Sequence, residues 1–402
     1  MTGARACNAR LKPRLGTAAE SGDSARLRAG PSREFTRAVL AMLLLAAAPP
    51  TRLTAQDSQF GIRGLGTPDR WESIRARTTG GAFASFDPLS PAADAALIHL
   101  PRLTATAAAA SSYRTVELGG EEASLQSTRF PSLGVGGPLV PRVRIGGGFT
   151  SYLGRSYRST TRDSMLLRGE MEPFTDDVTS EGGVTDIRLG AAWRPVSRVA
   201  VGGSFHVLTG STRVTAVRRY DDSTNYAPAG EVDHPRFDGL GVSAGVLVDL
   251  RRNIHVAGYL RSDNRLRYKT RDTTGAYDLP VTWGAAILWR PGTQAAFAAA
   301  VQASSWGDAQ GLGLPSHDTF GWSAGLEVGR PTLPLRLGVR GGQLPFGPGA
   351  EAPEEFAVAA GTGFRFSTGR AMIDLGVERV EREGGGLRER SWNVLVGITV
   401  RP

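Results

Sequence analysis

The sequence predicts an all-β protein, a transmembrane antiparallel β-barrel of about 14 strands with an N-terminal plug segment. Three observations predict it: an export-type leader, period-two alternation of apolar and polar residues after about residue 100, and connections that alternate between short and long. The chain has 402 residues, of which 41% are hydrophobic and 21% charged, with 52 Gly and 24 Pro. Gly and Pro together stay below the ~25–30% of low-complexity chains, which excludes a mostly disordered protein.

Residues 1–55 have the features of a leader with a signal peptide. Arg33 and Arg37 precede an apolar run over 38–48, and the small-residue sequence Leu53–Ala55 follows. The run is shorter than the ~20 residues that a spanning helix needs, so export is favoured over the alternative of an N-terminal anchor. Nine basic and three acidic residues in this leader account for six of the nine net positive charges. The remaining three are spread along the chain and do not indicate nucleic-acid binding.

The strands are predicted from alternation, which puts apolar side chains on one face and polar or small ones on the other. The segment 389–401 is the clearest example, because Trp392, Val394 and Val396 alternate with polar or small residues. Segments of ~9–12 residues are long enough to cross a bilayer as tilted strands. Strands are expected at 101–114, 122–138, 142–156, 182–194, 198–210, 236–250, 253–263, 276–290, 294–305, 318–330, 333–344, 355–367, 370–381 and 389–401.

The connections between these segments alternate in length. Short turns are expected at 139–141, 194–197, 250–253, 290–293, 330–333 and 367–369. Longer polar connections are expected at about 157–181, 209–235, 263–276, 305–317, 344–354 and 382–388. Outer-membrane barrels have short turns on the periplasmic side and long loops on the external side, so this alternation is typical of such a barrel. The alternative is a soluble β-sandwich or propeller, whose strands average about five or six residues, roughly half the length expected here.

Residues 56–100 do not alternate, and glycines and prolines interrupt them. They contain large apolar residues such as Phe60, Trp71 and Phe83, which need burial. The simplest arrangement ahead of a barrel is a plug folded into the lumen. The expected organisation is therefore a leader at 1–55, a plug at 56–100 and a barrel at 101–402.

Two groups of motifs resemble a known family. The run Gly80–Phe83 followed by Asp87–Ala93 resembles the N-terminal hatch of the FadL-like long-chain fatty-acid and hydrocarbon transporters. The runs Trp322–Val328 and Leu333–Val339 resemble paired strands of the same family. The resemblance implies a plugged outer-membrane barrel for passive uptake of hydrophobic small molecules such as fatty acids or hydrocarbons. It further implies a substrate path at the plug, formed by Phe83, Phe86, Asp87, Pro88, Ser90 and Pro91.

The expected partners follow from this resemblance: a hydrophobic small-molecule ligand and the lipid of the outer membrane of a diderm bacterium, with the protein acting as a monomer. Two alternatives remain open. A general porin would pass hydrophilic solutes through an open lumen, and a secretion-system scaffold or shuttle with a similar hatch would bind a protein partner instead of transporting.

Charged residues on the polar faces of the strands are expected to point into the lumen, because a lipid-facing Arg at mid-bilayer costs ~2–4 kcal/mol. Two interpretations are possible. The charges form ion pairs across the lumen that support the plug, or they simply line a hydrated interior. The candidates are Arg188, Asp249, Arg336, Arg340, Asp374 and Glu378.

No catalytic or cofactor chemistry is predicted. Gly241–Gly245 fits the G-x-S-x-G pattern, but Ser243 lies in an alternating strand and not in the strand-turn-helix of a nucleophile elbow. The five histidines show no metal-binding spacing. The sequence therefore predicts a protein that is not an enzyme, with no metal and no cofactor.

Overall fold

The computed structural model describes residues 57–402, apart from residues 63, 71, 91–93, 309–315 and 367–368. The predicted leader, together with Trp71 and Pro91, lies outside the described residues. Within this described part, no helix is both long and apolar enough to cross a membrane.

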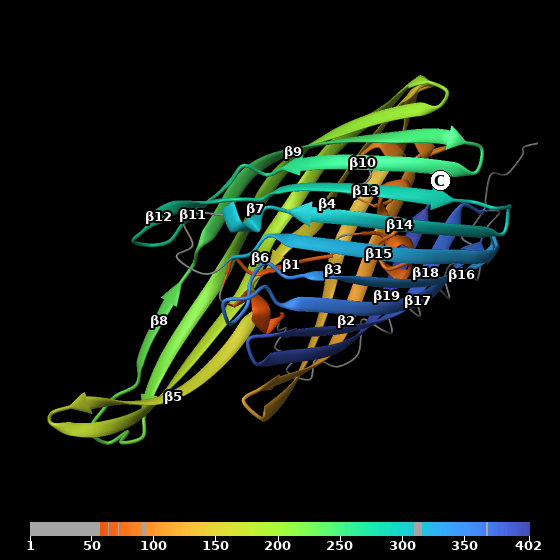
Figure 1. Cartoon of the computed structure of the whole chain (residues 1–402). Coiled ribbons are helices and arrows are strands. Elements are labelled where there is room, and N and C mark those ends of the chain that lie inside the picture. The colour runs from red at the N-terminus through yellow and green to blue at the C-terminus, as the bar shows by residue number, and fades with distance from the viewer. Residues whose placement is uncertain (1–56, 63, 71, 91–93, 309–315, 367–368) are drawn as a thin grey trace, which may run out of the picture. The chain divides into compact units, whose positions relative to one another are not determined.

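Fourteen antiparallel strands pair in sequence order and close into a ring (Figure 1). The ring closes where β19 pairs with β2, from Leu387 opposite Leu118 to Val400 opposite Ala105. The strands are β2 (Thr104–Leu118), β3 (Glu121–Val140), β4 (Val143–Gly154), β6 (Glu170–Val196), β7 (Val199–Tyr220), β9 (Arg236–Arg251), β10 (Ile254–Ser262), β13 (Val281–Trp289), β14 (Ala295–Ser304), β15 (Thr319–Arg330), β16 (Leu333–Gln343), β17 (Glu354–Phe366), β18 (Ala371–Gly384) and β19 (Leu387–Val400). The predicted antiparallel β-barrel and its strand number are confirmed.

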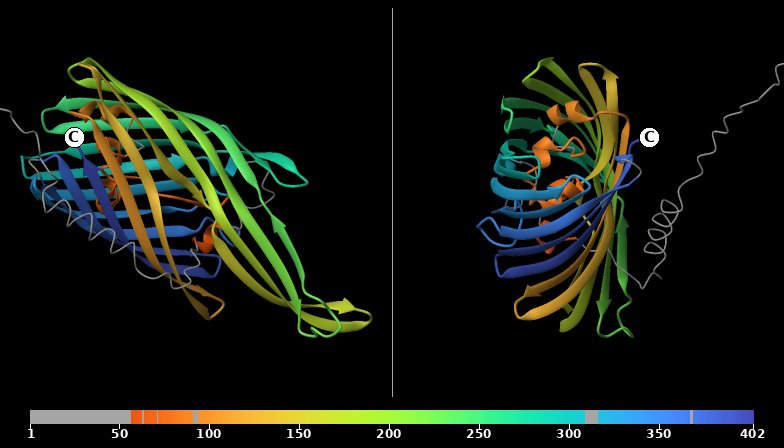
Figure 2. Two further views of the ribbon diagram at one scale, coloured as in Figure 1. Left: turned by 180° about the vertical axis from the view of Figure 1, so that it is seen from behind. Right: turned by 90° about the vertical axis from the view of Figure 1, so that its right-hand side faces the viewer.

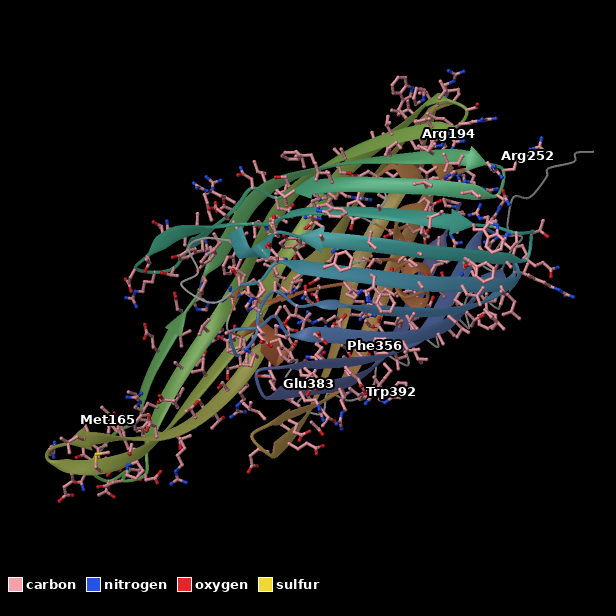
Figure 3. All side chains as sticks on the ribbon, in the orientation of Figure 1. Met165, Arg194, Arg252, Phe356, Glu383 and Trp392 are labelled. Atoms are coloured by element: carbon pink, nitrogen blue, oxygen red, sulfur yellow. The ribbon has the colours of Figure 1, made fainter. Side chains whose placement is uncertain are left out.

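Alternation along each strand gives the barrel an apolar outer face. In β13, Trp283 is 48% exposed on the outside, whereas Leu288 on the opposite face is 1% exposed. Phe356 and Trp392 also lie on the outer face, and Figure 3 labels both. An apolar side chain on the outer face is not stabilised by contact with water but is stabilised by contact with lipid. The apolar outer face is therefore suited to an apolar environment.

The predicted long connections at 157–181, 209–235 and 263–276 are mostly strands and not loops. Further strands extend the wall beyond the ring: β5 (Tyr157–Leu167), β8 (Ala229–Asp233), β11 (Arg265–Lys269) and β12 (Thr274–Asp278). Figure 1 shows β5 at the end of this projection. Polar residues occupy both faces over most of β5, so alternation does not reveal that strand. In β11 the buried Leu266 does alternate with exposed arginines, but the strand has only five residues.

The predicted long connection at 382–388 is instead a tight hairpin. The strands β18 and β19 meet at Gly385 and Gly386, whose φ angles are +57° and +79°. Two consecutive residues with positive φ are typical of the two-residue type I′ hairpin turn, which glycine adopts without steric cost.

The described residues between 57 and 100 lie against the inner face of the barrel, visible in orange in the right-hand view of Figure 2. They contain the two-residue strand β1 (Thr67–Pro68), the short helix α2 (Ile74–Thr78) and the 3-10 turns η1 (Gln59–Gly61), η2 (Ala84–Phe86) and η3 (Ala95–His99). A further turn, η4 (Trp306–Asp308), follows β14. The helix α2 begins at Ser73, whose side chain accepts a hydrogen bond from the backbone N–H of Ala76 at 3.1 Å.

Glycines in the barrel wall make room for the end of α2. A Cβ added to Gly338 would lie 2.0 Å from the carbonyl carbon of Thr79, and one added to Gly325 would lie 2.4 Å from the carbonyl oxygen of Thr79. The backbone of residues 79–80 therefore sits directly on the backbone of β15 and β16, at a distance that only glycine permits.

Substituting Gly325→Ala is expected to dislodge this contact and destabilise the protein by about 1–3 kcal/mol, because the new methyl group overlaps the Thr79 carbonyl. The measurement is the thermal unfolding midpoint of the purified protein, with limited trypsin digestion reporting access to Arg75 and Arg77. Gly321→Ala is the matched control on the same face of β15, since its Cβ would lie 3.7 Å from the nearest atom. Equal midpoints and digestion rates for the two variants would contradict the steric argument.

Candidate functional site

The candidate site is the contact between residues 57–100 and the inner wall, and its first part is a set of ion pairs around α2. Arg75 donates two hydrogen bonds of 2.8 Å to Glu327 of β15. Arg77 donates one of 2.7 Å to Glu378 of β18. Both arginines of the N-terminal segment form ion pairs with carboxylates of the wall, so charge-assisted hydrogen bonds hold the segment in place.

Four of the predicted lumen-facing charges take part in this set. Arg336 Nε donates to Glu327 at 2.8 Å, and its Nη1 donates to Asp374 at 2.5 Å. Arg340 donates to Glu355 at 2.9 Å and also pairs with Glu378. Arg336, Arg340, Asp374 and Glu378 are all buried. The pairs run between neighbouring strands as well as to the segment, so most charges in this part of the wall have an opposite charge in contact.

A second anchor lies at Asp94, directly before η3. The Asp94 carboxylate is 3% exposed and accepts hydrogen bonds from three wall residues. Ser243 Oγ donates at 2.5 Å, Arg188 Nη1 donates at 3.2 Å, and Ser204 Oγ also donates. Arg188, a predicted lumen-facing charge, therefore contacts the N-terminal segment from β6.

Behind Asp94 lies a hydrogen-bonded series that the sequence did not predict. His206 Nε2 lies 2.9 Å from Ser243 Oγ, and His206 Nδ1 lies 2.9 Å from an Asp186 oxygen. The order serine, histidine, carboxylate matches that of a hydrolytic triad. The Ser243 hydroxyl is, however, also bonded to Asp94, and His206 is 1% exposed. In this structure the series connects the wall to the N-terminal segment.

The pairing of Ser243 with His206 depends on strand register. These residues lie on β9 and β7, where Ser243 is opposite Ser204 and His206 is opposite Gly241. The sequence shows that each of these residues lies on the inner face of its strand. It does not show the register between β7 and β9, which decides which inner residues are neighbours. The G-x-S-x-G pattern drew attention to Ser243 but gave no indication that His206 is its neighbour.

The residues predicted to form the substrate path lie near the buried centre of the segment. Phe83, Phe86, Asp87 and Ser90 are all buried, and Pro88 is half-buried. Asp87 accepts a 2.6 Å hydrogen bond from Ser73 Oγ, which links this turn to the start of α2. Pro91 lies outside the described residues. Asp249, the remaining predicted charge, pairs with His255 at 2.5 Å, away from α2.

Cavities lie between the described part of the segment and the wall. A small one of about 30 Å³ lies between Leu89, Leu97 and Leu100 of the segment and the Gly-containing wall of β3 and β4. A larger one of about 260 Å³ lies on the other side, where Tyr259 and Trp306 are among its lining residues. Among the residues with described positions, no group of three or more His, Cys, Asp or Glu side chains is placed to hold a metal ion.

No protein-family model and no curated protein matches this sequence. Solved structures do match. A FadL homologue from Pseudomonas aeruginosa superposes with a TM-score of 0.62 at 11% identity, covering 84% of this chain and 99% of that one. The Pseudomonas putida toluene transporter TodX gives 0.56 at 15%, covering 85% and 99%. The monoaromatic hydrocarbon channel CymD gives 0.54 at 14%, covering 84% and 98%.

These likenesses show the fold: the chain has the β-barrel architecture of the FadL homologue and of the two hydrocarbon channels, as the hatch and strand motifs implied. Their low identity makes the chain a divergent example of that fold. Two of the three are named as a toluene transporter and a monoaromatic hydrocarbon channel and the third as a FadL homologue, and none is named as an enzyme.

Substituting Asp94→Asn is expected to weaken the second anchor by about 1.5–3 kcal/mol, because hydrogen bonds to a charged acceptor are replaced by neutral ones beside the buried Arg188. The thermal unfolding midpoint should fall, and conductance in planar bilayers should rise as the segment leaves the wall. Asp238→Asn provides the control, since Asp238 is exposed on β9 and pairs with Arg267, which is exposed as well. An unchanged midpoint and conductance in Asp94→Asn would rule out an anchoring role for Asp94.

Proposed function

We propose that this protein is an outer-membrane channel for the passive uptake of hydrophobic small molecules, of the fatty-acid or hydrocarbon class, in a diderm bacterium. The observation that carries the proposal is the segment 57–100 seated in a lumen whose wall meets it at an apolar cavity. In this proposal the segment is a plug, and Phe83, Phe86, Asp87, Pro88, Ser90 and Pro91 lie along the substrate path.

The apolar cavity supports a route for such ligands that avoids water. It lies between leucines of the plug and the strands β3 and β4, where Gly134, Gly136 and Gly147 leave the wall without side chains. The register of β2 and β3 shifts between Ala108 and Ala110, close to Pro131. A bulge and a run of glycines weaken strand pairing, so this part of the wall is the proposed lateral exit.

An apolar ligand is favoured on this route for a simple energetic reason. Keeping its surface out of water saves ~25 cal/mol per Å² relative to passage through a wet pore. The outward-facing apolar residues of the barrel are proposed to contact membrane lipid, and the ligand would leave the wall directly into that lipid. A single closed ring contains the whole route, which supports a monomer as the transporting unit.

Cells that carry the gene are expected to take up a labelled long-chain fatty acid or an alkylbenzene faster than cells without it, with no difference for a labelled sugar. The measurement is the initial rate of uptake for each compound. Gene-dependent uptake of the sugar alone would identify a general porin. No gene dependence for any compound would favour a scaffold with a protein partner and would end the transport proposal.

Substituting Leu89→Trp should reduce uptake of the apolar compounds several-fold, because the larger ring fills the cavity between the plug and the wall. Leu89 is half-buried, which leaves part of the ring in open space and limits the cost to folding. Leu103→Trp is the control, since Leu103 is 54% exposed just before β2. Equal uptake rates in the two variants would exclude this cavity from the route.

A further inference from the structure

The rim of the barrel that carries the short turns is basic. These turns join β3 to β4, β6 to β7, β9 to β10, β13 to β14, β15 to β16 and β17 to β18. Figure 3 labels Arg194 and Arg252 at this end of the barrel and Met165 at the other. Each turn carries an exposed arginine, and these turn arginines are Arg142, Arg198, Arg252, Arg290, Arg330 and Arg370.

The carboxylates on the strand ends nearest to this rim are engaged by other residues. Asp249 pairs with His255. Glu327 and Asp374 both pair with Arg336. Within the part of the chain that the structure describes, none of the turn arginines belongs to an ion pair. Their charge is therefore not neutralised by the protein.

The opposite end of the barrel has charges of both signs. Several exposed arginines there are paired, among them Arg162 with Asp221 and Arg267 with Asp238. Unpaired positive charge at every turn is thus a property of the short-turn rim, and it is accessible because the turn arginines are exposed.

Apolar side chains of the outer face lie directly beside the turn arginines. Leu250 and Trp289 are exposed and precede Arg251 and Arg290 in the chain. The Trp289 ring stacks on that of Phe297 from the next strand, with centroids 5.4 Å apart. Aromatic side chains of membrane barrels gather where the hydrocarbon meets the head-group layer. This places the neighbouring arginines at the level of lipid head groups.

Two adjacent turns bring three arginines to one stretch of the rim. The backbone N–H of Arg290 donates a hydrogen bond of 2.8 Å to the carbonyl oxygen of Asn253, which joins the β13–β14 turn to the β9–β10 turn. Arg251 and Arg252 of one turn and Arg290 of the other are all exposed. Guanidinium groups match the geometry of a phosphate, which they bind through paired N–H donors.

We propose that the short-turn rim binds the head groups of anionic phospholipids in the surrounding leaflet. Arg251, Arg252 and Arg290 form one such site, and Trp289 contacts the acyl chains beside it. The short turns of outer-membrane barrels face the periplasm, so the leaflet is the periplasmic one. The proposal rests on the membrane location given under the proposed function and does not depend on uptake.

A lipid fits this rim better than a free anion or a protein does. A free anion gains little from exposed arginines alone. The acyl chains of a lipid lie against the apolar outer face and keep the phosphate beside the arginines, so the attraction of the charges adds to a contact already made. The arginines occur at every turn around the ring, as lipid does, and not on one side, where a single protein partner would dock.

Tryptophan fluorescence of the full-length protein in vesicles tests the proposal. The vesicles contain dibrominated phosphatidylcholine, which quenches lipid-exposed tryptophans, mixed with non-brominated phosphatidylglycerol or non-brominated phosphatidylcholine. Comparison with Trp289→Phe gives the part of the signal that comes from Trp289. We expect phosphatidylglycerol to displace the quencher from Trp289 at least about fivefold better than phosphatidylcholine does, since one arginine near an anionic surface contributes about that factor.

The triple variant Arg251→Gln, Arg252→Gln and Arg290→Gln should make the two lipids displace the quencher about equally. The three side chains are exposed in turns, so their replacement removes charge and leaves the barrel core intact. If this variant does not fold, Arg290→Gln alone is measured and should reduce the preference for phosphatidylglycerol several-fold.

The matched control is the triple variant Arg265→Gln, Arg267→Gln and Arg271→Gln. It removes the same charge from exposed positions in and after β11, at the opposite end of the barrel, and should keep the preference. Equal displacement by the two lipids in the wild-type protein would overturn the proposal and leave an acidic protein as the partner of the rim. An equal loss in both triple variants would overturn it too. Alkylbenzene uptake is measured separately, so the lipid proposal can fail while the transport proposal stands.

Discussion

The closure of the ring between β19 and β2 is the constraint on which the rest of the structure depends. It pairs the last strand with the first along 14 register positions and leaves no open edge among the wall strands. In hydrocarbon an unpaired backbone group has no water to bond, so only a closed sheet is stable there. Closure also fixes which residues face inward, and it creates a lumen that side chains alone do not fill. The N-terminal segment occupies this space, and the wall supplies glycines where the backbones touch and opposite charges where side chains meet.

Buried charges inside the barrel are stabilised by pairing, and the pairs restrict how the N-terminal segment and the strands can move relative to one another. Glu378 meets Arg77 of the segment and Arg340 of the next strand but one. Removing one member of such a set leaves the others buried without compensation, which costs several kcal/mol. The ion pairs therefore tie the position of the segment to the register of β16 and β18.

Most of the fold could be predicted from the sequence because apolar and polar residues alternate in every strand whose outer face meets an apolar environment. The segment 389–401 was predicted almost to the residue, since Trp392, Val394 and Val396 mark the outer face. The projecting strand β5 was predicted as a loop because both of its faces are wet. The candidate site was predicted only in part. Arg336 and Glu378 were recognised as lumen-facing because they lie at polar positions of alternating strands. The contacts of Asp94 and His206 depend on the register between strands, which no local sequence pattern encodes.

The wall strands differ greatly in length, and this gives the rim an uneven height. β6 has 27 residues and β10 has 9, so at ~3.3 Å per residue β6 is roughly 60 Å longer. A strand of nine residues just matches a bilayer, and the remainder of β6 and its neighbour β7 must stand in water. If that end faces outward, the tip near Asp221 rises above the lipid head groups and is the first part of the protein that a phage or an antibody meets. Its distance from the lumen makes it a suitable position for an affinity tag or a fluorescent label in living cells.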